Sequence, residues 1–303
     1  MKRKGFTLIE LLVVIGIIGI LASIMVTVMS SGNESALAAK CMANMKTLAT
    51  AVQSYGMVDN RYPLAGSVEC WVGSRRGEKP GWLSWNSQGI YNQKDKNGKT
   101  GQKNHVSSSS WFQSAYNQDF ESSEYCYTNG ALWRYVSGIR DVFICPVHAR
   151  DKKFHDRPPK WTYVMNGWFG WDTSKGGKTL SSYWKDYGVQ SKTDRRLLFA
   201  EMPFSGIGVD AKTSSSSGTQ CDCTLQYKGF DGDSAQGDEV IGFNHKVGKR
   251  DWYAHIVYAD GHTEKLRWPK DGMGVEEMQE LTFWLCKGID FAFSDGKYKK
   301  VEN

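Results

Sequence analysis

The chain has 303 residues, enough for one sizeable hydrophobic core or for one domain with an appendage. Its net charge of +6 is mild and its charged residues are interspersed, which argues against a nucleic-acid-binding surface and predicts no nucleic-acid partner. The 12 Trp, 14 Tyr and 13 Phe either fill a loop-rich core or, in part, form exposed ring faces that hold sugars or partner proteins.

The N-terminal segment has the length and charge pattern of a membrane-spanning helix. A basic tip, residues 1–4, precedes residues 11–29, which carry no charged side chain and can cross the ~30 Å hydrocarbon layer as a helix. Positive charge before the apolar run places the N-terminus in the cytoplasm and the rest of the chain outside. A cleaved signal peptide is the alternative. However, the apolar run is long for a signal peptide, and the candidate cleavage site Ala-Leu-Ala at 36–38 lies well beyond its end.

Glu10 interrupts this apolar character and needs an explanation. A carboxylate inside a bilayer costs about 2.5–3.5 kcal/mol on insertion scales, so it either has a partner or lies near the headgroups. The string Lys-Gly-Phe-Thr-Leu-Ile-Glu at 4–10, followed by an unbroken apolar helix, resembles the class III signal of type IV pilins and type II secretion pseudopilins. The resemblance implies that a prepilin peptidase cuts between Gly5 and Phe6 and methylates the new amine of Phe6. It also implies that the Phe6 amine of one subunit pairs with Glu10 of its neighbour during assembly.

A second helical segment follows the polar break at Gly32 and Asn33, where the helix could kink or melt locally. Its apolar residues recur at spacings of three and four, which predicts one long helix over roughly 6–56 whose second half packs one stripe on a globular domain. The stripe consists of Leu37, Cys41, Met45, Leu48, Val52 and Tyr55.

The helix and its breaks divide the chain into predicted parts: a leader at 1–5, a transmembrane or polymer-core helix at 6–30, its amphipathic continuation at 31–57 and a globular domain at 58–303. Within the globular domain, residues 86–110 are rich in Gly, Asn, Gln, Lys and Ser without an apolar period, which predicts a flexible surface loop.

Regular structure is predicted again in the remaining sequence. "ALWRYV" (131–136) indicates a helix, and "DVFICP" (141–146), "WTYVMNG" (161–167) and "RRLLFAE" (195–201) indicate strands. "AHIVYADGHTEKLRW" (254–268) predicts a hairpin around Asp260-Gly261, a pair suited to a two-residue type I′ turn. A closing amphipathic helix is marked by Val275, Met278, Leu281 and Leu285. The expected class is α+β and pilin-like: a long N-terminal helix packed on an antiparallel sheet, with long loops.

The same region carries a second resemblance. "CPVH", "YVMNG", "LLFAE" and "NH…YADGH" look like successive landmarks of the prepilin-type processing-associated domain, whose signature is a histidine, nine residues and Asp-Gly. Here fourteen residues separate His245 from Asp260-Gly261, and Arg250 occupies the usual position of the histidine. No catalytic activity is implied by this resemblance.

Two metal sites can be postulated. Four acidic residues are expected to form a solvated acidic turn, because their spacing does not match an EF-hand; the alternative is a structural calcium site, since the pseudopilin resemblance implies calcium in a C-terminal loop. They are Asp231, Asp233, Asp238 and Glu239. A zinc site could form from Cys145, His148, Cys221 and Cys223. His255 and His262 flank the hairpin turn and are expected to cap or pack there.

The seven cysteines suggest disulfides, because the chain is predicted to be exported. Cys41 belongs to the stalk helix and could be simply buried. Six partners then remain in fifteen pairings: Cys70, Cys126, Cys145, Cys221, Cys223 and Cys286.

Known catalytic motifs are absent from the sequence: both Gly-Lys-Thr triplets lack the glycine of a phosphate loop, and neither H-E-x-x-H nor G-x-S-x-G occurs. The expected function is therefore that of a non-enzymatic, pilin-like subunit of a type II secretion pseudopilus or a type IV pilus, for protein export or surface attachment. The implied partners are prepilin peptidase, other pilin or pseudopilin subunits, the assembly platform of the inner membrane and the membrane itself, with the globular domain periplasmic or extracellular. The alternative is a membrane-anchored, exported carbohydrate-binding or enzymatic domain, for which Trp82, Trp85, Trp168 and Trp171 would supply ring faces.

Overall fold

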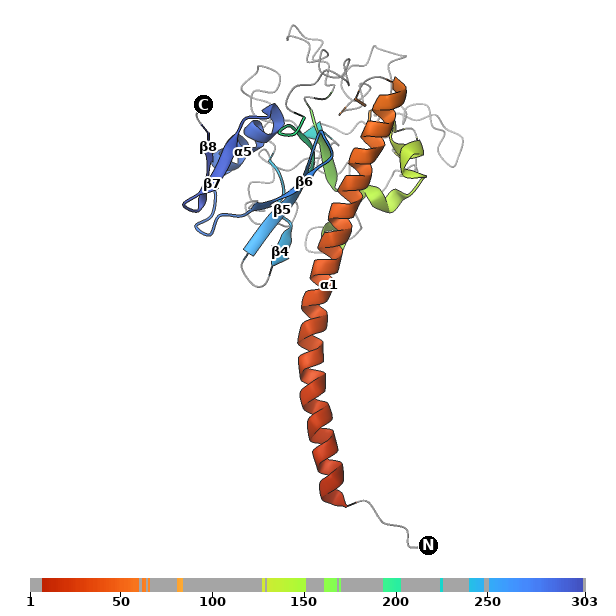
Figure 1. Ribbon diagram of the computed structural model, residues 1–303, viewed down its shortest axis with the longest axis vertical. Helices are drawn as coiled ribbons and strands as arrows, with labels where there is room; N and C mark the ends of the chain where they lie inside the picture. The colour runs from red at the N-terminus through yellow and green to blue at the C-terminus, as the bar shows by residue number, and fades with distance from the viewer. Residues whose placement is uncertain are drawn as a thin grey trace, which may run out of the picture.

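One helix, α1 (Leu8–Asp59), forms a stalk and then continues along the head of the molecule (Figure 1). The computed structural model describes residues 7–59 (without the side chains of 26–31), 62–63, 65, 81–83, 127–128, 130–150, 161–167, 169, 193–202, 224–225, 240–247 and 251–301. At 1.5 Å per residue, the 52 residues of α1 span about 78 Å. The helix continues without interruption through Gly32 and Asn33, where the sequence allows a kink, and it extends past Gly56 to Asp59.

The first half of α1 has the properties of a membrane-spanning helix. The 18-residue segment Leu8–Met25 is long and apolar enough to cross a bilayer, and none of its side chains is buried in the structure. Figure 1 shows this half projecting away from the head. An exposed apolar helix of this length requires lipid or other helices around it, because water would hydrate its side chains at high cost.

The second half of α1 packs against the head through the predicted stripe. Cys41, Met45, Leu48 and Val52 are fully buried, whereas Leu37, at the start of the stripe, is half-buried. Asn44 adds a polar contact: its Nδ2 donates to the carbonyl oxygens of Asp141 and Ile144, both at 2.9 Å.

The head is built on a six-stranded sheet in the order β3-β1-β2-β5-β4, with β6 paired to β5. Its strands are β1 (Tyr163–Asn166), β2 (Leu197–Glu201), β3 (Thr224–Leu225), β4 (His245–Val247), β5 (Asp251–Tyr258) and β6 (Thr263–Arg267). One edge of β5 pairs with β6, and the other edge is shared by β4 and β2. All pairs are antiparallel except β1–β3, which is parallel, so the predicted α+β, pilin-like class is confirmed.

Both faces of the sheet are covered. Every residue of β1 and β2 is buried, as is expected for continuous apolar strands with packing on each side. The helix α1 contacts β2, β4 and β5, and α5 (Val275–Lys287) contacts β2. A hairpin of β7 (Phe291–Ser294) and β8 (Lys297–Lys300) follows α5 at the side of the head away from the stalk (Figure 1).

Short helices complete the packing around α1: η3 (Trp133–Val136), η4 (Arg140–Phe143) and α3 (Pro146–Arg150). The strand predicted for 141–146 was therefore wrong. Val142 and Phe143 are buried as a strand would bury them, but they lie in a single 3₁₀ turn beside α1. A short apolar run does not distinguish the two conformations.

The turn type predicted at Asp260-Gly261 was also wrong. A type I′ turn needs positive φ at both central residues, but only Gly261 has it, at 93°. Tyr258 accepts from the Gly261 N–H and donates its own N–H to the His262 carbonyl, which makes a type I turn followed by a left-handed glycine. The type I′ turn occurs instead at Asp295-Gly296, between β7 and β8, where φ is 53° and 77°.

Candidate functional site

The N-terminus of α1 begins with a local hydrogen-bonded arrangement. Glu10 Oε2 accepts from the backbone N–H of Thr7 at 2.7 Å and from its hydroxyl at 2.8 Å, and the Glu10 N–H lies 3.3 Å from Thr7 Oγ1. This is a capping box, in which Thr7 and Glu10 satisfy each other's backbone donors. The sequence pattern Thr-x-x-Glu is its usual signal, so it could have been found beside the processing motif. The predicted cleavage residues Gly5 and Phe6 lie outside the described residues.

A second polar constellation lies deep in the head, where four segments meet. It consists of Cys41 in α1, Cys145 just before α3, Glu201 at the end of β2 and His245 at the start of β4. Each of the four residues is at most 1% exposed. Their ligand-type atoms all lie within 4.8 Å of one another. We call these four residues the buried cluster.

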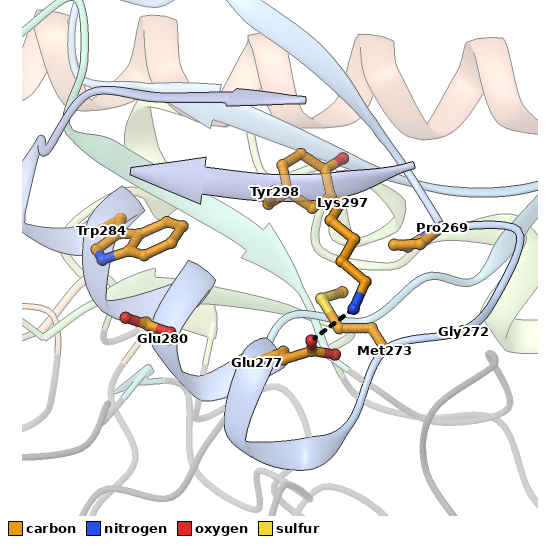
Figure 2. A pocket seen from close by; sticks show the side chains of 8 residues that line it. All are labelled: Pro269, Gly272, Met273, Glu277, Glu280, Trp284, Lys297 and Tyr298. Carbon is orange, nitrogen blue, oxygen red and sulfur yellow. Dashed lines mark ion pairs between the residues drawn. The ribbon is translucent and has the colours of Figure 1, made fainter. Parts of the chain in front are cut away.

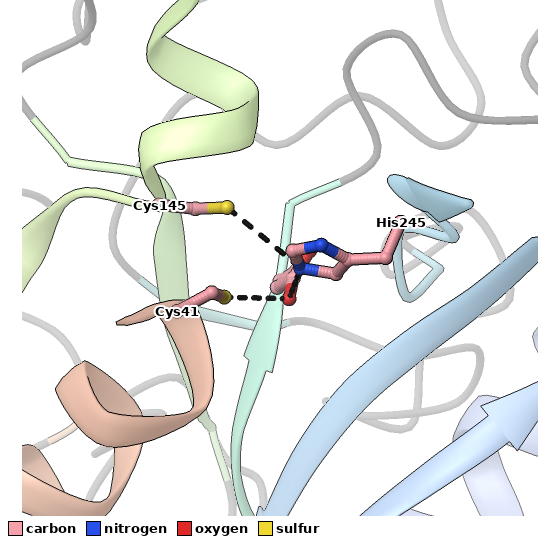
Figure 3. Close-up of side chains that lie close together, drawn as sticks. Cys41, Cys145 and His245 are labelled. Carbon is pink, nitrogen blue, oxygen red and sulfur yellow. Dashed lines mark hydrogen bonds and ion pairs between the residues drawn. The ribbon is translucent and has the colours of Figure 1, made fainter. Parts of the chain in front are cut away.

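The buried cluster converges on one carboxylate oxygen. Glu201 Oε1 lies 2.6 Å from His245 Nε2 and 2.9 Å from Cys41 Sγ. Cys145 Sγ lies 3.8 Å from the same His245 nitrogen. Figure 3 shows Cys41, Cys145 and His245 pointing toward one another from separate elements.

The groups of the buried cluster polarise one another strongly. Burial alone would lower the pKa of His245, but the Glu201 carboxylate outweighs it and raises that pKa to about 10. Burial alone would raise the pKa of Glu201, yet the charges and hydrogen bonds of His245 and His255 hold it well below its usual range. Burial, Cys145 and Glu201 together raise the pKa of the Cys41 thiol well above its usual value. At neutral pH, Glu201 is therefore ionised, His245 is protonated and Cys41 is a thiol.

Three further side chains support the buried cluster from outside. The Tyr163 hydroxyl lies 3.2 Å from Cys41 Sγ, and Asn244 Nδ2 donates to Glu201 Oε2 at 3.1 Å. His255 Nδ1 lies 3.3 Å from Glu201 Oε1. Both carboxylate oxygens of Glu201 therefore have polar neighbours, and the Cys41 thiol lies beside the Tyr163 hydroxyl.

Sequence reasoning found His245 and Cys145 but not their partners. The predicted zinc group joined Cys145 to His148, whereas among the described residues it is Cys41 and His245 that meet Cys145. Cys221 and Cys223, the other members of that group, lie outside the described part of the chain. One sequence signal could have indicated Cys41 as a partner: it lies on the apolar stripe of α1, and this stripe must face the sheet.

Asp260 and Gly261 have a structural role in the hairpin. Asp260 Oδ1 accepts from the His262 backbone at 3.0 Å, and the His262 ring stacks on Tyr258 with centroids 4.3 Å apart. Gln53 of α1 donates to the Asp260 carbonyl at 3.0 Å, so the turn docks on the helix. His262 caps and packs as expected, and His255 packs beside Glu201.

The other predicted sites are tested only in part. The calcium candidates Asp231, Asp233, Asp238 and Glu239 and the loop 86–110 lie outside the described residues. Cys41, Cys145 and Cys286 are buried and form no disulfide, and the remaining cysteines lie outside the described ranges. Trp82 is fully buried against Phe143 and Phe199, which gives it a core role rather than an exposed ring face. Trp85, Trp168 and Trp171 are outside the described residues.

A small hollow between α5 and the β7–β8 hairpin is the other concave feature of note (Figure 2). It is lined by Pro269, Gly272, Met273, Glu277, Glu280, Trp284, Lys297 and Tyr298. Lys297 Nζ and Glu277 Oε1 face each other at 3.9 Å, and both side chains are more than half exposed. A solvated ion pair of this kind is worth little, and the Tyr298 hydroxyl of the lining already donates to the Arg267 carbonyl at 2.8 Å.

Comparison with known proteins gives matches over limited stretches. Residues 1–26 match the family model described as the prokaryotic N-terminal methylation motif. A stretch of 62 residues is 39% identical to type II secretion system core protein G of Pectobacterium carotovorum subsp. carotovorum, covering 20% of this chain and 40% of that protein. The namesakes from Aeromonas hydrophila and Escherichia coli (strain K12) are 40% and 39% identical over 62 residues, covering 43% of each.

The chain therefore spans about two fifths of the length of the curated relatives it matches. No solved structure is detectably similar to it. The findings support a prepilin-like protein that has an N-terminal methylation motif and is related to type II secretion core protein G. The resemblance of His245 and Asp260-Gly261 to the processing-associated domain stays a prediction.

Proposed function

We propose that the chain is a pilin-like structural subunit, cleaved between Gly5 and Phe6 by a prepilin peptidase and assembled through α1 into a type II secretion pseudopilus or a type IV pilus. The observation that carries the proposal is the exposed apolar segment Leu8–Met25, which lies within the residues that match the methylation motif. Before assembly, lipid would surround this segment, and in a fibre the same helices of neighbouring subunits would replace the lipid.

The proposed assembly contact joins the Phe6 amine of one subunit to Glu10 of the next. Glu10 makes its local contacts to Thr7 through Oε2, which leaves Oε1 for a partner. A charge-assisted hydrogen bond is stronger in a low-dielectric surrounding than in water, so the pair would select one register of neighbouring helices. In the monomer, the Glu10 carboxylate accepts hydrogen bonds from Thr7 alone among the described residues.

The expected location follows from the same segment. The basic N-terminus would lie in the cytoplasm, α1 would cross the inner membrane once, and the head would lie in the periplasm or outside the cell. The expected partners are prepilin peptidase, sibling subunits and the assembly platform. The relatives named above favour the pseudopilus, with protein export as the process served. The chain's role would then be mechanical rather than enzymatic.

The test compares two glutamates of α1 in cells that carry the secretion machinery. We expect Glu10→Ala to be processed normally, with a mature chain that begins at N-methylated Phe6 by mass spectrometry, but to be lost from the sheared fibre fraction. Glu34→Ala is the matched control, because Glu34 is a half-exposed residue near Arg150 and should assemble as the wild type does. Normal fibres from Glu10→Ala, or a mature chain that begins at Met1 or Ala39, would overturn the proposal.

A further inference from the structure

The buried cluster is more elaborate than a buried ion pair needs. His245 Nε2 and Glu201 already pair at 2.6 Å, yet two thiols also face them, Cys41 at 2.9 Å from the carboxylate and Cys145 at 3.8 Å from the imidazole. The four residues come from four separate segments of the chain. A Cys41–Cys145 disulfide would account for the thiols alone and an ion pair for the other two groups alone. One metal ion would account for all four.

We infer that Cys41, Cys145, Glu201 and His245 form a structural zinc site that fastens α1 to the head. The inference concerns the head alone and does not depend on how the N-terminus is processed. Two thiolates, one imidazole and one carboxylate are ligands that zinc accepts in four-coordinate, tetrahedral geometry. Calcium and magnesium prefer oxygen ligands alone, so this donor set does not suit them.

The dimensions of the buried cluster fit such an ion after a small adjustment. Donor atoms around a tetrahedral zinc lie about 3.3–3.8 Å apart, given Zn–N near 2.0 Å and Zn–S near 2.3 Å. The separation of Cys145 Sγ from His245 Nε2, 3.8 Å, already has this size. The two contacts of Glu201 Oε1, at 2.6 and 2.9 Å, need to open by less than about 1 Å.

Charge and surroundings also suit the ion. Zinc would displace the protons of the Cys41 and Cys145 thiols and one proton of the His245 ring into solvent, since metal ligands bind in their deprotonated forms. Two thiolates and a carboxylate leave the loaded site one negative charge. The Tyr163 hydroxyl at 3.2 Å from Cys41 Sγ and Asn244 Nδ2 at 3.1 Å from Glu201 Oε2 are the hydrogen-bond donors expected around such ligands.

The position of the site defines its role. Cys41 lies near the start of the buried stripe of α1, where the stalk first meets the head, and the other three ligands belong to the head. The four fully buried ligands leave no room for a substrate, so the site would be structural rather than catalytic. The ion would add to the hydrophobic contact that the stripe of α1 makes with the head.

The test measures zinc in the full chain, purified in detergent without chelator. We expect one zinc per chain by elemental mass spectrometry, lost in Cys41→Ser and in His245→Gln but kept in Cys286→Ala, which removes a buried thiol in α5 outside the buried cluster. X-ray absorption on the wild-type protein should give two sulfur ligands at about 2.3 Å and two lighter ones. This second measurement holds even where a variant fails to fold.

Three results would overturn the inference. The first is a chain that takes up no zinc after reduction of its thiols and exposure to the ion. The second is zinc that persists in Cys41→Ser and His245→Gln, which would place the metal elsewhere. The third is a Cys41–Cys145 disulfide in peptides of the native protein.

A variant outside the ligand set refines the test. Tyr163→Phe removes only the hydroxyl beside Cys41, and loss of such a supporting hydrogen bond should weaken zinc binding about 10–100-fold in competition with a chromophoric chelator. Tyr298→Phe is its control, because the Tyr298 hydroxyl bonds the Arg267 carbonyl at 2.8 Å, away from the buried cluster. Equal zinc affinity for the two variants would contradict a coordinating role for Cys41.

Discussion

Gly261 shows how one residue joins the hairpin to the stalk helix. Its φ of 93° is a conformation that L side chains rarely adopt, and it closes the turn between β5 and β6. A Cβ at this position would lie 2.9 Å from Gln53 Nε2, the group that donates to the Asp260 carbonyl. The backbone conformation therefore favours glycine in the Asp-Gly pair, and a Cβ there would also displace the Gln53 amide from its hydrogen bond.

We expect Gly261→Ala to lower the free energy of unfolding by about 1–3 kcal/mol, because it forces a side chain into a positive φ and against Gln53. Gly272→Ala is the matched control: its φ is 84°, but a Cβ there meets nothing within 4 Å. Urea unfolding of both variants separates the two causes. A loss no greater in Gly261→Ala than in Gly272→Ala would show that the contact with α1 contributes nothing.

The buried cluster was predictable only in fragments. Cys145 and His245 were singled out from local motifs, but their partners Cys41 and Glu201 are distant in sequence and belong to segments that sequence patterns described as packing elements. Their meeting depends on the strand order, which places the end of β2 near the start of β4 through their shared neighbour β5. Strand order is a property of the whole sheet, so no spacing of residues could reveal this group.

Elements of strong periodicity were predicted well. The stripe of α1 repeats an apolar residue at each turn over five turns, a pattern that only an amphipathic helix explains. The β5–β6 hairpin and the helix α5 were also predicted from clear apolar patterns. Short apolar runs were ambiguous, as η4 shows. The β7–β8 hairpin went unpredicted although Asp295-Gly296 is the same dipeptide as Asp260-Gly261 and has β-forming residues on each side.

A single amide, that of Asn44, adds hydrogen bonds to the apolar contact between α1 and η4. Asn44 is buried and its Nδ2 serves two carbonyl groups, those of Asp141 and Ile144, at the point where η4 turns into Cys145. Neither apolar burial nor helix propensity explains an asparagine here. Its place on α1 positions the segment that carries Cys145.

We expect Asn44→Ala to destabilise the chain by about 1–3 kcal/mol, since it removes the amide donor from the Ile144 carbonyl and leaves the Asp141 carbonyl only the Ile144 N–H, at 3.3 Å. Thr50→Ala is the control, because Thr50 is an exposed residue of the same helix whose hydroxyl bonds the Lys46 carbonyl within that helix. Chemical denaturation of the two variants gives the comparison. If Asn44→Ala is as stable as Thr50→Ala, the amide does not hold η4 in place.

At the scale of the whole molecule, the two halves of α1 have different surroundings. Side chains of Leu8–Met25 make no buried contact with the head, whereas the stripe from Cys41 to Tyr55 belongs to the main hydrophobic core. The apolar first half is therefore available to lipid or to other helices, whereas the second half contributes to folding. Both halves belong to one continuous helix, Leu8–Asp59.

Removing residues 1–31 should therefore separate association from folding. We expect the remaining chain, which begins at Gly32, to be monomeric without detergent and to keep its free energy of unfolding within about 0.5 kcal/mol of the full chain, as for changes at exposed positions. Sedimentation and near-UV circular dichroism on heating measure the two properties, with the full chain in detergent as reference. If the truncated chain aggregates as the full chain does, the surface responsible for self-association lies on the head. A truncated chain that unfolds far more easily would mean that the stalk supports the fold through contacts beyond those of its described side chains.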